Sequence, residues 1–439
     1  MIAIWINGLN EGLWAFFLPL LILLGLFINL NMVKGRAKIS DADISSWQFS
    51  KIKGALSISL ASKVGTGAII GVLAAMWQGS VHGGSGEGIV FWVLVGMLFL
   101  VPITYSEVLF TQICKQTHRD FIKTNLNAKA ATVYALGLVA LYAFGFVGFQ
   151  LTGVQTVVRY FSENYLDYQF NSVTALFYIV VPIILLAGMV IITKSRHLFI
   201  NTLSSLIFII ILAYLCFFLL FVYQTRDFIS QYFTNIYDDV MNFHSAGIGI
   251  PIGLIIAFQR IIQISETSLG TSALSSSDGE NSPRREAFVQ TISTLISIAI
   301  AVIITSYVFA YGQAHIEGVA LVGDSFERVK GYIFTVFQVT GYFGLSIVLL
   351  FFVVSGFTTI LGSFHYVNTC LNISEKGRII AYLFLISLSG ALSVTHFDII
   401  FEASNLLMFI VGAINLLAMA FFIHKKIHIF HLIKNKGSL

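Results

Sequence analysis

Long apolar stretches alternate with short polar connections along the chain. Runs such as 18–30, 176–192 and 199–222 are nearly free of charge, and about 20 apolar residues suffice for a helix to cross the hydrocarbon core of a bilayer. Hydropathy and helix breakers predict eleven membrane-spanning helices. They cover residues 11–30, 55–78, 88–113, 133–160, 176–193, 198–223, 246–275, 288–311, 343–366, 378–394 and 400–424. In the longest connection, about 312–342, Tyr332 to Val339 are expected to form a short interfacial helix.

Composition agrees with this all-α, polytopic fold class. The 439 residues are 57% hydrophobic and 10% charged, whereas a soluble domain carries roughly 25% charged residues. We therefore expect a single transmembrane domain over 1–439, with the lipid bilayer as its surroundings and no room for a soluble domain. The net charge of +4 is explained by basic cytoplasmic connections, so no nucleic-acid partner is expected.

The basic residues in the connections predict the orientation. Alternate connections hold nineteen Lys and Arg in one set and only four in the other, namely Arg159, Arg226, Arg328 and Lys330. Positively charged connections stay in the cytoplasm. The N-terminus is therefore expected outside and the C-terminus in the cytoplasm of a multi-pass cell-membrane protein, which requires an odd number of spans.

Two predicted spans are interrupted by polar or glycine-rich sequence. The second contains Val64-Gly65-Thr66-Gly67, and the seventh turns polar at 263–270. They lie five spans apart and so cross the membrane in opposite directions. This pattern predicts an inverted repeat of five plus five helices, over about 55–223 and 246–424, after one extra helix at 11–30; interrupted helices at matching positions point to a transporter site.

The breaks supply the candidate substrate site. Free N–H groups at the start of a half-helix can hold a carboxylate. The alternative interpretation is a glycine packing groove between helices. Glutamines in the fourth span are further candidates, with interhelical hydrogen bonding as the alternative. The candidate substrate-binding residues are Gly65, Thr66, Gly67, Ala68, Gln150, Gln155, Gln263, Ile264 and Ser265.

Hydroxyl groups in the ninth span suggest a sodium site. Ser355, Thr358 and Thr359 share one helical face, and carbonyl and hydroxyl oxygens are hard, neutral ligands. With carbonyls near Val64 and Gly67 they form the candidate Na⁺ site. The alternative is that the hydroxyls bond to carbonyls of their own helix.

Charged residues within predicted spans cost about 2.5 to 3.5 kcal/mol each to insert, and four of them are candidates for a functional role. Lys63, Arg260 and Glu266 belong to the interrupted helices and are expected to face the interior, with a Lys63–Glu266 ion pair as a hypothesis. Glu107 lies near the cytoplasmic end of its span, where snorkelling to water is the alternative to a functional role.

These segments resemble the alanine or glycine:cation symporter family. The stretch 55–72, with Ala61-Ser62-Lys63-Val64-Gly65-Thr66-Gly67, follows the family's unwound helix, and Tyr105-Ser106-Glu107-Val108, 265–270, 283–290 and 357–362 resemble later segments in the right order. The resemblance covers nearly the whole chain. It implies a LeuT-like fold and sodium-coupled symport of alanine or glycine by alternating access, with Na⁺ as coupling ion and no other cofactor.

Some positions depart from the family pattern. Ala68 stands where the family has an asparagine after Gly-Thr-Gly, Ile264-Ser265 replaces a Ser-Asn pair, and a tryptophan expected near Ser363 is absent. A larger or wetter pocket is therefore expected, which tolerates side chains somewhat bigger than that of alanine.

Other function classes are weighed against symport. The chain has neither an H-E-x-x-H nor a G-x-S-x-G motif, so no enzyme activity is expected. A non-transporting amino-acid sensor is one alternative. The other is a proton-coupled or sodium-independent carrier of another small solute, in which the charge of Lys63 replaces a bound cation.

Overall fold

The computed structural model describes residues 2–34, 59–60, 63–81, 86–193, 196–242, 245–246, 250–276 and 282–435. Residues 82–85 of the connection 82–87, which is expected outside, lie outside the described residues, as do most of the first basic connection and residues 436–439. Apart from two strands of two residues each, β1 (Ser245–Ala246) and β2 (Ile250–Pro251), the described elements are helices. The all-α fold class is confirmed.

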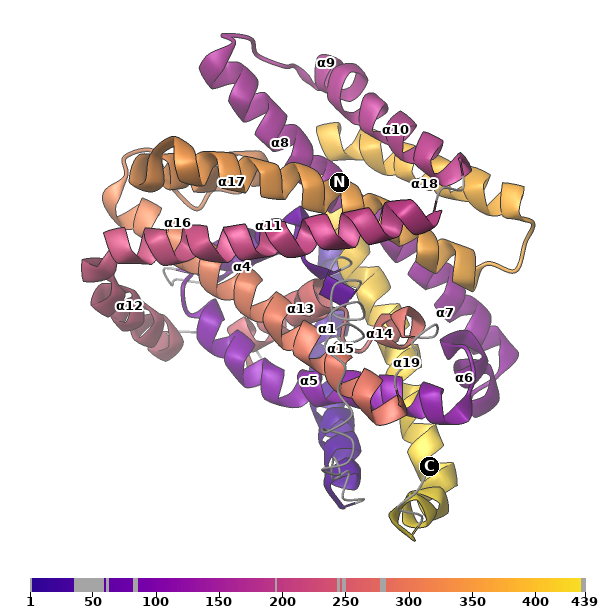
Figure 1. The fold of residues 1–439 in the computed structure, drawn as a ribbon. Helices are drawn as coiled ribbons and strands as arrows, with labels where there is room; N and C mark the ends of the chain where they lie inside the picture. Colours follow the sequence, from indigo (N-terminus) through magenta and orange to yellow (C-terminus); the bar gives the residue numbers. More distant parts are fainter. Residues whose placement is uncertain are drawn as a thin grey trace.

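Figure 1 shows the helices of the first half of the chain. Two of them contain inserted π-helical turns, η1 and η2. Its elements are α1 (Ile2–Lys34), α4 (Thr66–Val81), α5 (Ile89–Cys114), α6 (His118–Asn125), α7 (Ala128–Ala140), η1 (Leu141–Phe146), α8 (Val147–Tyr165), α9 (Ser172–Ala175), η2 (Leu176–Val180), α10 (Val181–Ile192), α11 (Arg196–Gln224), η3 (Arg226–Phe228) and α12 (Ile229–Asn242). Helices α7, η1 and α8 form one continuous candidate span over Ala128–Tyr165.

The second half begins with a short helix and contains the two longest of the described helices, α17 and α19. Its elements are α13 (Ile252–Ser265), α14 (Thr271–Ser275), α15 (Pro283–Ala299), η4 (Ile300–Ile304), α16 (Thr305–His315), α17 (Ser325–Cys370), α18 (Glu375–Thr395) and α19 (Phe397–Asn435). Helix α17 is kinked at Gly341, whose φ of 60° and ψ of −152° are not helical. The helix predicted at Tyr332 to Val339 is the segment of α17 before this kink.

Eight helices in the described part of the chain are long and apolar enough to cross a membrane, or up to nine with a bent pair at Phe208–Gln224 and Arg226–Met241. Two shorter apolar helices, Thr66–Val81 and Gly253–Ser265, fall in the interrupted second and seventh spans. The chain therefore has the helices of a multi-pass membrane protein. Length and composition alone do not give the count of eleven, which stays a prediction.

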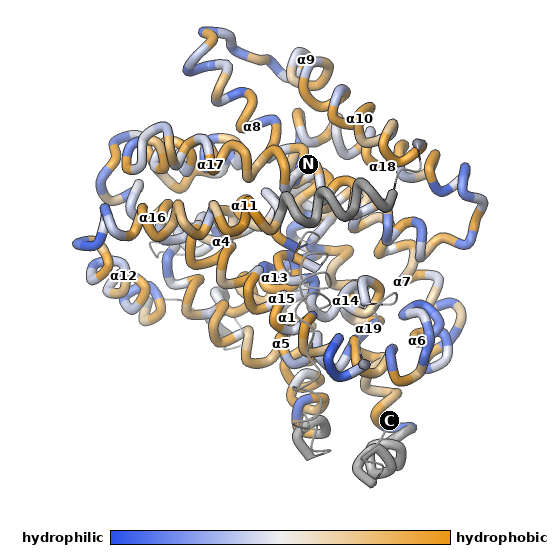
Figure 2. The backbone as a smooth tube through the Cα atoms, in the orientation of Figure 1, coloured by the Kyte–Doolittle hydropathy of each residue, from blue (hydrophilic) through white to orange (hydrophobic). Residues whose placement is uncertain are grey.

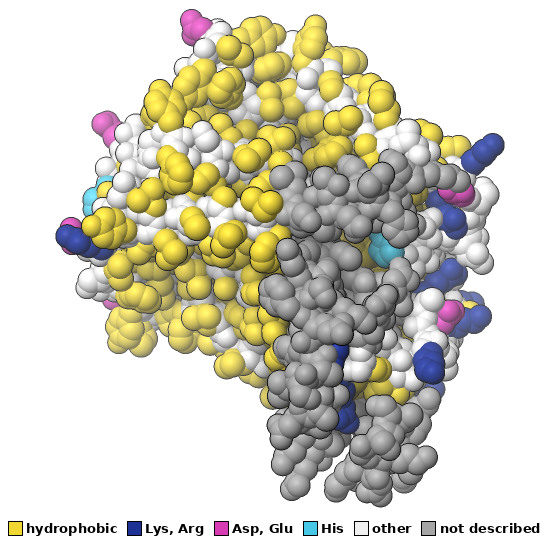
Figure 3. Space-filling view, in the orientation of Figure 1, with side chains coloured by type: hydrophobic (Ala, Val, Ile, Leu, Met, Phe, Trp, Pro, Cys, Tyr) yellow, Lys and Arg dark blue, Asp and Glu magenta, His cyan; other side chains and the backbone are white. Residues whose placement is uncertain are grey.

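Hydrophobic and hydrophilic residues occupy different parts of the molecule. Figure 2 shows hydrophobic residues along the helices and hydrophilic residues concentrated towards their ends and connections. In Figure 3 hydrophobic side chains cover much of the visible described surface, and Lys and Arg side chains gather at its right-hand edge, where Figure 1 places α6. This separation is what a bilayer requires.

Helix α12 was not predicted. It bends away from α11 by 76° and is amphipathic: Phe233, Tyr237 and Met241 are exposed, whereas Tyr232 and Asp239 are buried. Asp239 accepts a hydrogen bond of 3.0 Å from the Gly88 backbone at the start of α5. Because its apolar residues occupy only part of its circumference, average hydropathy did not reveal it.

Small residues allow helices to approach around α4. A Cβ atom added to Gly153 of α8 would lie 2.5 Å from Cβ of Thr66, and one added to Gly356 of α17 would lie 2.6 Å from Cγ2 of Val154. Helices α4, α8 and α17 therefore pack with little room for a larger residue. Elsewhere, α1 packs along α19, where the rings of Phe17 and Phe409 have centroids 4.6 Å apart.

We predict that Gly153→Ala destabilises the protein, because the added methyl group displaces Thr66 at the start of α4. Overpacking of this kind costs about 1 to 3 kcal/mol. Gly362→Ala is the matched control, because no atom lies within 4 Å of a Cβ at that position. Thermal unfolding of the purified variants measures the difference; equal melting temperatures for the two variants contradict the packing.

Candidate functional site

The first helix break precedes α4. Val64 still donates to the Leu60 carbonyl at 2.8 Å, but Val64 and Gly65 are not helical and α4 begins only at Thr66. A Cβ on Gly65 would lie 2.9 Å from Oγ1 of Thr359 and from both amide atoms of Gln150. Gly65 thus lets the interrupted backbone approach two polar side chains.

The second break follows α13. Glu266, Ser268 and Gly270 have positive φ angles of 58°, 67° and 77°, a conformation that non-glycine residues rarely adopt. Thr267 fixes the loop, because its hydroxyl donates to the Leu100 carbonyl at 2.9 Å. Strained backbone of this kind clusters at functional sites in proteins.

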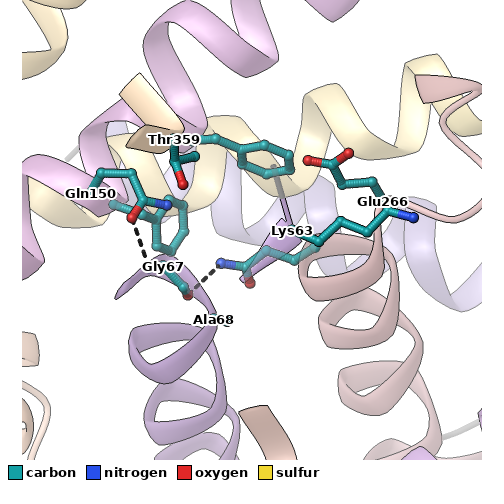
Figure 4. Close-up of a pocket in the computed structure, with 9 residues that line it drawn as sticks. Lys63, Gly67, Ala68, Gln150, Glu266 and Thr359 are labelled. Carbon is teal, nitrogen blue, oxygen red and sulfur yellow. Dashed lines mark hydrogen bonds between the residues drawn. The ribbon is translucent and has the colours of Figure 1, made fainter. Parts of the chain in front are cut away.

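The two breaks meet at one buried pocket. It is lined by Lys63, Gly67, Ala68, Phe146, Phe149, Gln150, Gln263, Glu266 and Thr359. Figure 4 shows Lys63 and Gly67 of the first break, Glu266 of the second, and Gln150 and Thr359 from two other helices around this space. The cavity volume of about 20 Å³ leaves room for water, but is far below the roughly 150 Å³ that accommodates benzene. In this conformation side chains must move before an amino acid can enter.

Two glutamines contact Gly67 from different helices. Oε1 of Gln150 accepts from the Thr66 hydroxyl at 2.7 Å and from the Gly67 N–H at 3.4 Å. Nε2 of Gln263 donates to the Gly67 carbonyl at 3.3 Å. The free backbone groups at the start of α4 are therefore satisfied by amide side chains.

Three other candidate substrate residues make contacts away from the pocket. Gln155 donates to the Ser393 carbonyl at 2.7 Å, which is the interhelical bond that the sequence left as an alternative. Ile264 is buried, and the Ser265 hydroxyl donates to the Ile261 carbonyl of its own helix at 2.6 Å. Neither Gln155, Ile264 nor Ser265 lines the cavity.

The hypothesised ion pair between Lys63 and Glu266 is not formed. The Lys63 ammonium donates instead to the hydroxyls of Ser272 and Thr294, both at 3.1 Å. The Glu266 carboxylate accepts from Thr271 at 3.2 Å and Tyr366 at 3.4 Å. Both charged side chains line the pocket, so neutral hydroxyl groups hold two opposite charges beside the same cavity.

Of the hydroxyl face predicted on α17, Thr359 lines the pocket, whereas Ser355 and Thr358 do not. The hydroxyls of Thr358 and Thr359 both donate to the Ser355 carbonyl, at 3.0 and 2.9 Å, and the Ser355 hydroxyl donates to Phe351 at 2.5 Å. Donation to these carbonyls leaves each hydroxyl oxygen with lone pairs that can face a cation.

Glu107 does not snorkel. Its side chain is 0% exposed, and Oε1 accepts a hydrogen bond of 2.6 Å from Nδ2 of Asn415, which also donates to the Ser268 carbonyl at 2.8 Å. Oδ1 of Asn415 lies 2.7 Å from Nε2 of His118. Burial lowers the pKa of His118 to about 4, so the imidazole is neutral. Because the Nδ2 group of Asn415 is used as a donor, its Oδ1 accepts, and Nε2 of His118 donates. Glu107 thus belongs to a network that supports the second break.

Comparison with known proteins identifies the family. The sodium:alanine symporter family matches residues 1–436. The chain belongs to this family. A probable sodium/glutamine symporter of Bacillus subtilis (strain 168) is 22% identical over 93% of this chain and 86% of its own length. Among solved structures, a Na⁺-coupled sialic acid symporter in a substrate-bound, outward-open state matches 97% of this chain and 83% of its own, with 13% identity and a TM-score of 0.49.

Membership in the sodium:alanine symporter family confirms the predicted resemblance. The chain is a member of a family of sodium-coupled amino-acid symporters, and the prediction that it is not an enzyme is confirmed. The family and the apolar helices together make it a multi-pass membrane protein.

Sequence reasoning missed several residues of this symporter site. Phe146 and Phe149 line the pocket, but two phenylalanines among many apolar residues carry no signal. Asn405 and Asn415 were detectable, because buried amides in an otherwise apolar span are unusual and need partners. Asn405 accepts a hydrogen bond from Arg260 of α13, and Asn415 donates one to Glu107 of α5.

Proposed function

We propose that the chain imports small neutral amino acids together with Na⁺ by alternating access. The observation that carries this proposal is the convergence of both helix breaks on one buried pocket with a positive and a negative side chain in its wall. A zwitterionic substrate has the matching charges. Alanine or glycine is the founding substrate that the family suggests, and Ala68 leaves room for somewhat larger side chains.

The carboxylate of the substrate binds at the start of α4. Among the described residues, the N–H of Gly67 makes a long hydrogen bond of 3.4 Å to Gln150, and Lys63 supplies a positive charge nearby. Movement of Gln150 exposes this N–H group to the carboxylate. The substrate ammonium then faces Glu266 and carbonyls freed by the break.

Na⁺ binds between the first break and α17. We assign the ligands from the break to the carbonyls of Val64 and Gly67, and those from the other helix, α17, to the oxygens of Ser355, Thr358 and Thr359. The close approach of Thr359 Oγ1 to Gly65 supports the site. Neutral oxygen ligands suit Na⁺, because they coordinate the ion without adding a second buried charge to the single charge of the ion.

The proposed transport cycle uses the inverted repeat. Repeat one covers about 55–223 and repeat two about 246–424, with α1 as the extra helix. We further propose an external N-terminus and a cytoplasmic C-terminus, in keeping with the nineteen basic residues in one set of connections and four in the other.

A second candidate function is sodium-independent transport. It is favoured by Lys63, whose ammonium lies in the pocket wall and is held by two neutral hydroxyls. In that case the lysine, and not Na⁺, supplies the positive charge at the first break. The response of uptake to imposed gradients separates the two functions.

We predict that proteoliposomes take up labelled alanine when an inward Na⁺ gradient is imposed, and that a K⁺ or proton gradient alone does not replace it. Serine should compete, whereas alanine amide should compete at least about tenfold less well, because the buried donors lose a carboxylate partner. Uptake that is independent of Na⁺ supports the second candidate. Equal competition by alanine amide contradicts carboxylate capture, and binding without uptake indicates a sensor.

We also predict that the double substitution Thr358→Ala, Thr359→Ala raises the Na⁺ concentration for half-maximal uptake by about tenfold or more, since two cation ligands are lost. The control is Thr335→Ala, Thr340→Ala, which removes two buried threonines of α17 that also donate to carbonyls of their own helix. The same Na⁺ dependence in both double variants rules out the proposed ion site.

A further inference from the structure

Arg260 is a buried cation near the pocket. It lies on α13, is 1% exposed, and stacks over the Phe401 ring with 4.6 Å between the guanidinium carbon and the ring centroid. Its NH2 group donates to Oδ1 of Asn405 at 2.6 Å, and its NH1 group donates to Oε1 of Gln263. Within the described residues no carboxylate lies at ion-pair distance from Arg260. Two neutral amides therefore hold its charge.

The chemistry of arginine fixes the orientation of Gln263. A guanidinium group has five N–H donors and no acceptor, so the amide that faces it must present its oxygen. The NH2 group of Gln263 then points the other way, where it donates to the Gly67 carbonyl. Since an amide nitrogen carries two hydrogens, one remains available beside the pocket that Gln263 lines.

The side-chain amide of Gln150 also has its oxygen engaged and its NH2 group available. Its oxygen is used by the Thr66 hydroxyl and the Gly67 N–H, which leaves its NH2 group without an acceptor in the described part of the chain. Gln150 and Gln263 therefore both offer N–H donors to the cavity around Gly67, although they come from different helices, α8 and α13. A pocket wall with donors of this kind favours a ligand that carries an acceptor.

Asn405 in turn is held by helices outside the pocket. The backbone carbonyl of Asn405 accepts a hydrogen bond of 3.2 Å from Nε1 of Trp14 on α1. One turn earlier on α19, the Glu402 carboxylate accepts a hydrogen bond of 2.6 Å from Asn10 of α1. Helix α1 thus supports α19 at the residue that anchors Arg260. The position of the guanidinium group is set from two sides, by Asn405 and by the Phe401 ring.

We propose that Arg260 is a positioning residue which fixes the NH2 group of Gln263 towards the pocket and thereby selects neutral amino acids whose side chain carries a carbonyl oxygen. Amide side chains have this chemistry. An apolar side chain of similar size leaves the donors of Gln150 and Gln263 unpaired, which weakens its binding. The inference rests on the proposed amino-acid pocket, but concerns binding and not coupling to Na⁺.

The test compares binding of asparagine and leucine, which are close in size and differ in their acceptor. Dissociation constants are measured from ligand-induced thermal stabilisation of the purified full chain, so transport is not required. The parent chain should bind asparagine at least about tenfold more tightly than leucine. Arg260→Met should lower this ratio by about tenfold, because Gln263 is then free to turn its oxygen to the pocket. Arg260→Lys should retain most of the preference for asparagine, since an ammonium group still faces the side-chain oxygen of Gln263.

Two further variants make the result decisive. Gln263→Met removes the oriented amide and leaves Arg260 intact, so it should lower the ratio as Arg260→Met does even if the latter fails to fold. Arg328→Met is the matched control: Arg328 is also buried, donates to the neutral carbonyls of Val322 and Gly323, and lies over the Trp77 ring. Its ratio should equal that of the parent.

Equal affinity of the parent chain for asparagine and leucine overturns the proposal, as does an unchanged ratio in Gln263→Met. An equal loss of the ratio in Arg328→Met shows a merely structural effect and also overturns it. Preferential asparagine binding without Na⁺-driven uptake contradicts the proposed symport and leaves the positioning role of Arg260 supported. The two failures are therefore distinguishable.

Discussion

The structure depends on the need to satisfy backbone polar groups where two helices are interrupted inside a membrane protein. An unpaired N–H or carbonyl group in the hydrocarbon region costs several kcal/mol, so irregular backbone is tolerated only where protein or water supplies partners. At the first break, Gln150 and Gln263 bond to Gly67. At the second, Asn415 bonds to the Ser268 carbonyl and Tyr134 to that of Leu269, at 2.8 and 2.6 Å.

The same partners give the pocket its chemistry. Side chains that replace the missing helical hydrogen bonds are polar and buried, and a substrate can exchange with them when they move. The small cavity, about 20 Å³, follows from this arrangement, because Gln150 occupies the N–H group that we assign to the substrate carboxylate. Helices α1 and α19 contribute indirectly, by holding Arg260 and Glu107 through Asn405 and Asn415. Binding is thereby linked to elements at a distance from the pocket.

The interrupted helices could be predicted from the sequence because glycine and polar residues stand out against apolar spans. Val64-Gly65-Thr66-Gly67 and the segment after Gln263 are where the structure places the breaks. Partner choice could not be predicted: Lys63 and Glu266 suggested an ion pair by charge alone, but hydroxyls of Ser272 and Thr294 lie closer to the ammonium. Helix α12 was missed because a helix that is apolar on one face has only moderate average hydropathy.

The central claim is that Na⁺ and an amino acid bind together where the two breaks meet, and cysteine protection tests it most directly. Ala68 lines the pocket, and the native cysteines Cys114, Cys216 and Cys370, which are not disulfide-bonded, can be replaced by serine. In that background, the rate at which Ala68→Cys reacts with a membrane-permeant thiol reagent is measured with alanine, in Na⁺ and in K⁺. The account predicts that alanine slows the reaction by about tenfold or more in Na⁺ and much less in K⁺, because an occupied pocket excludes the reagent. A rate that alanine does not change in Na⁺ would contradict it.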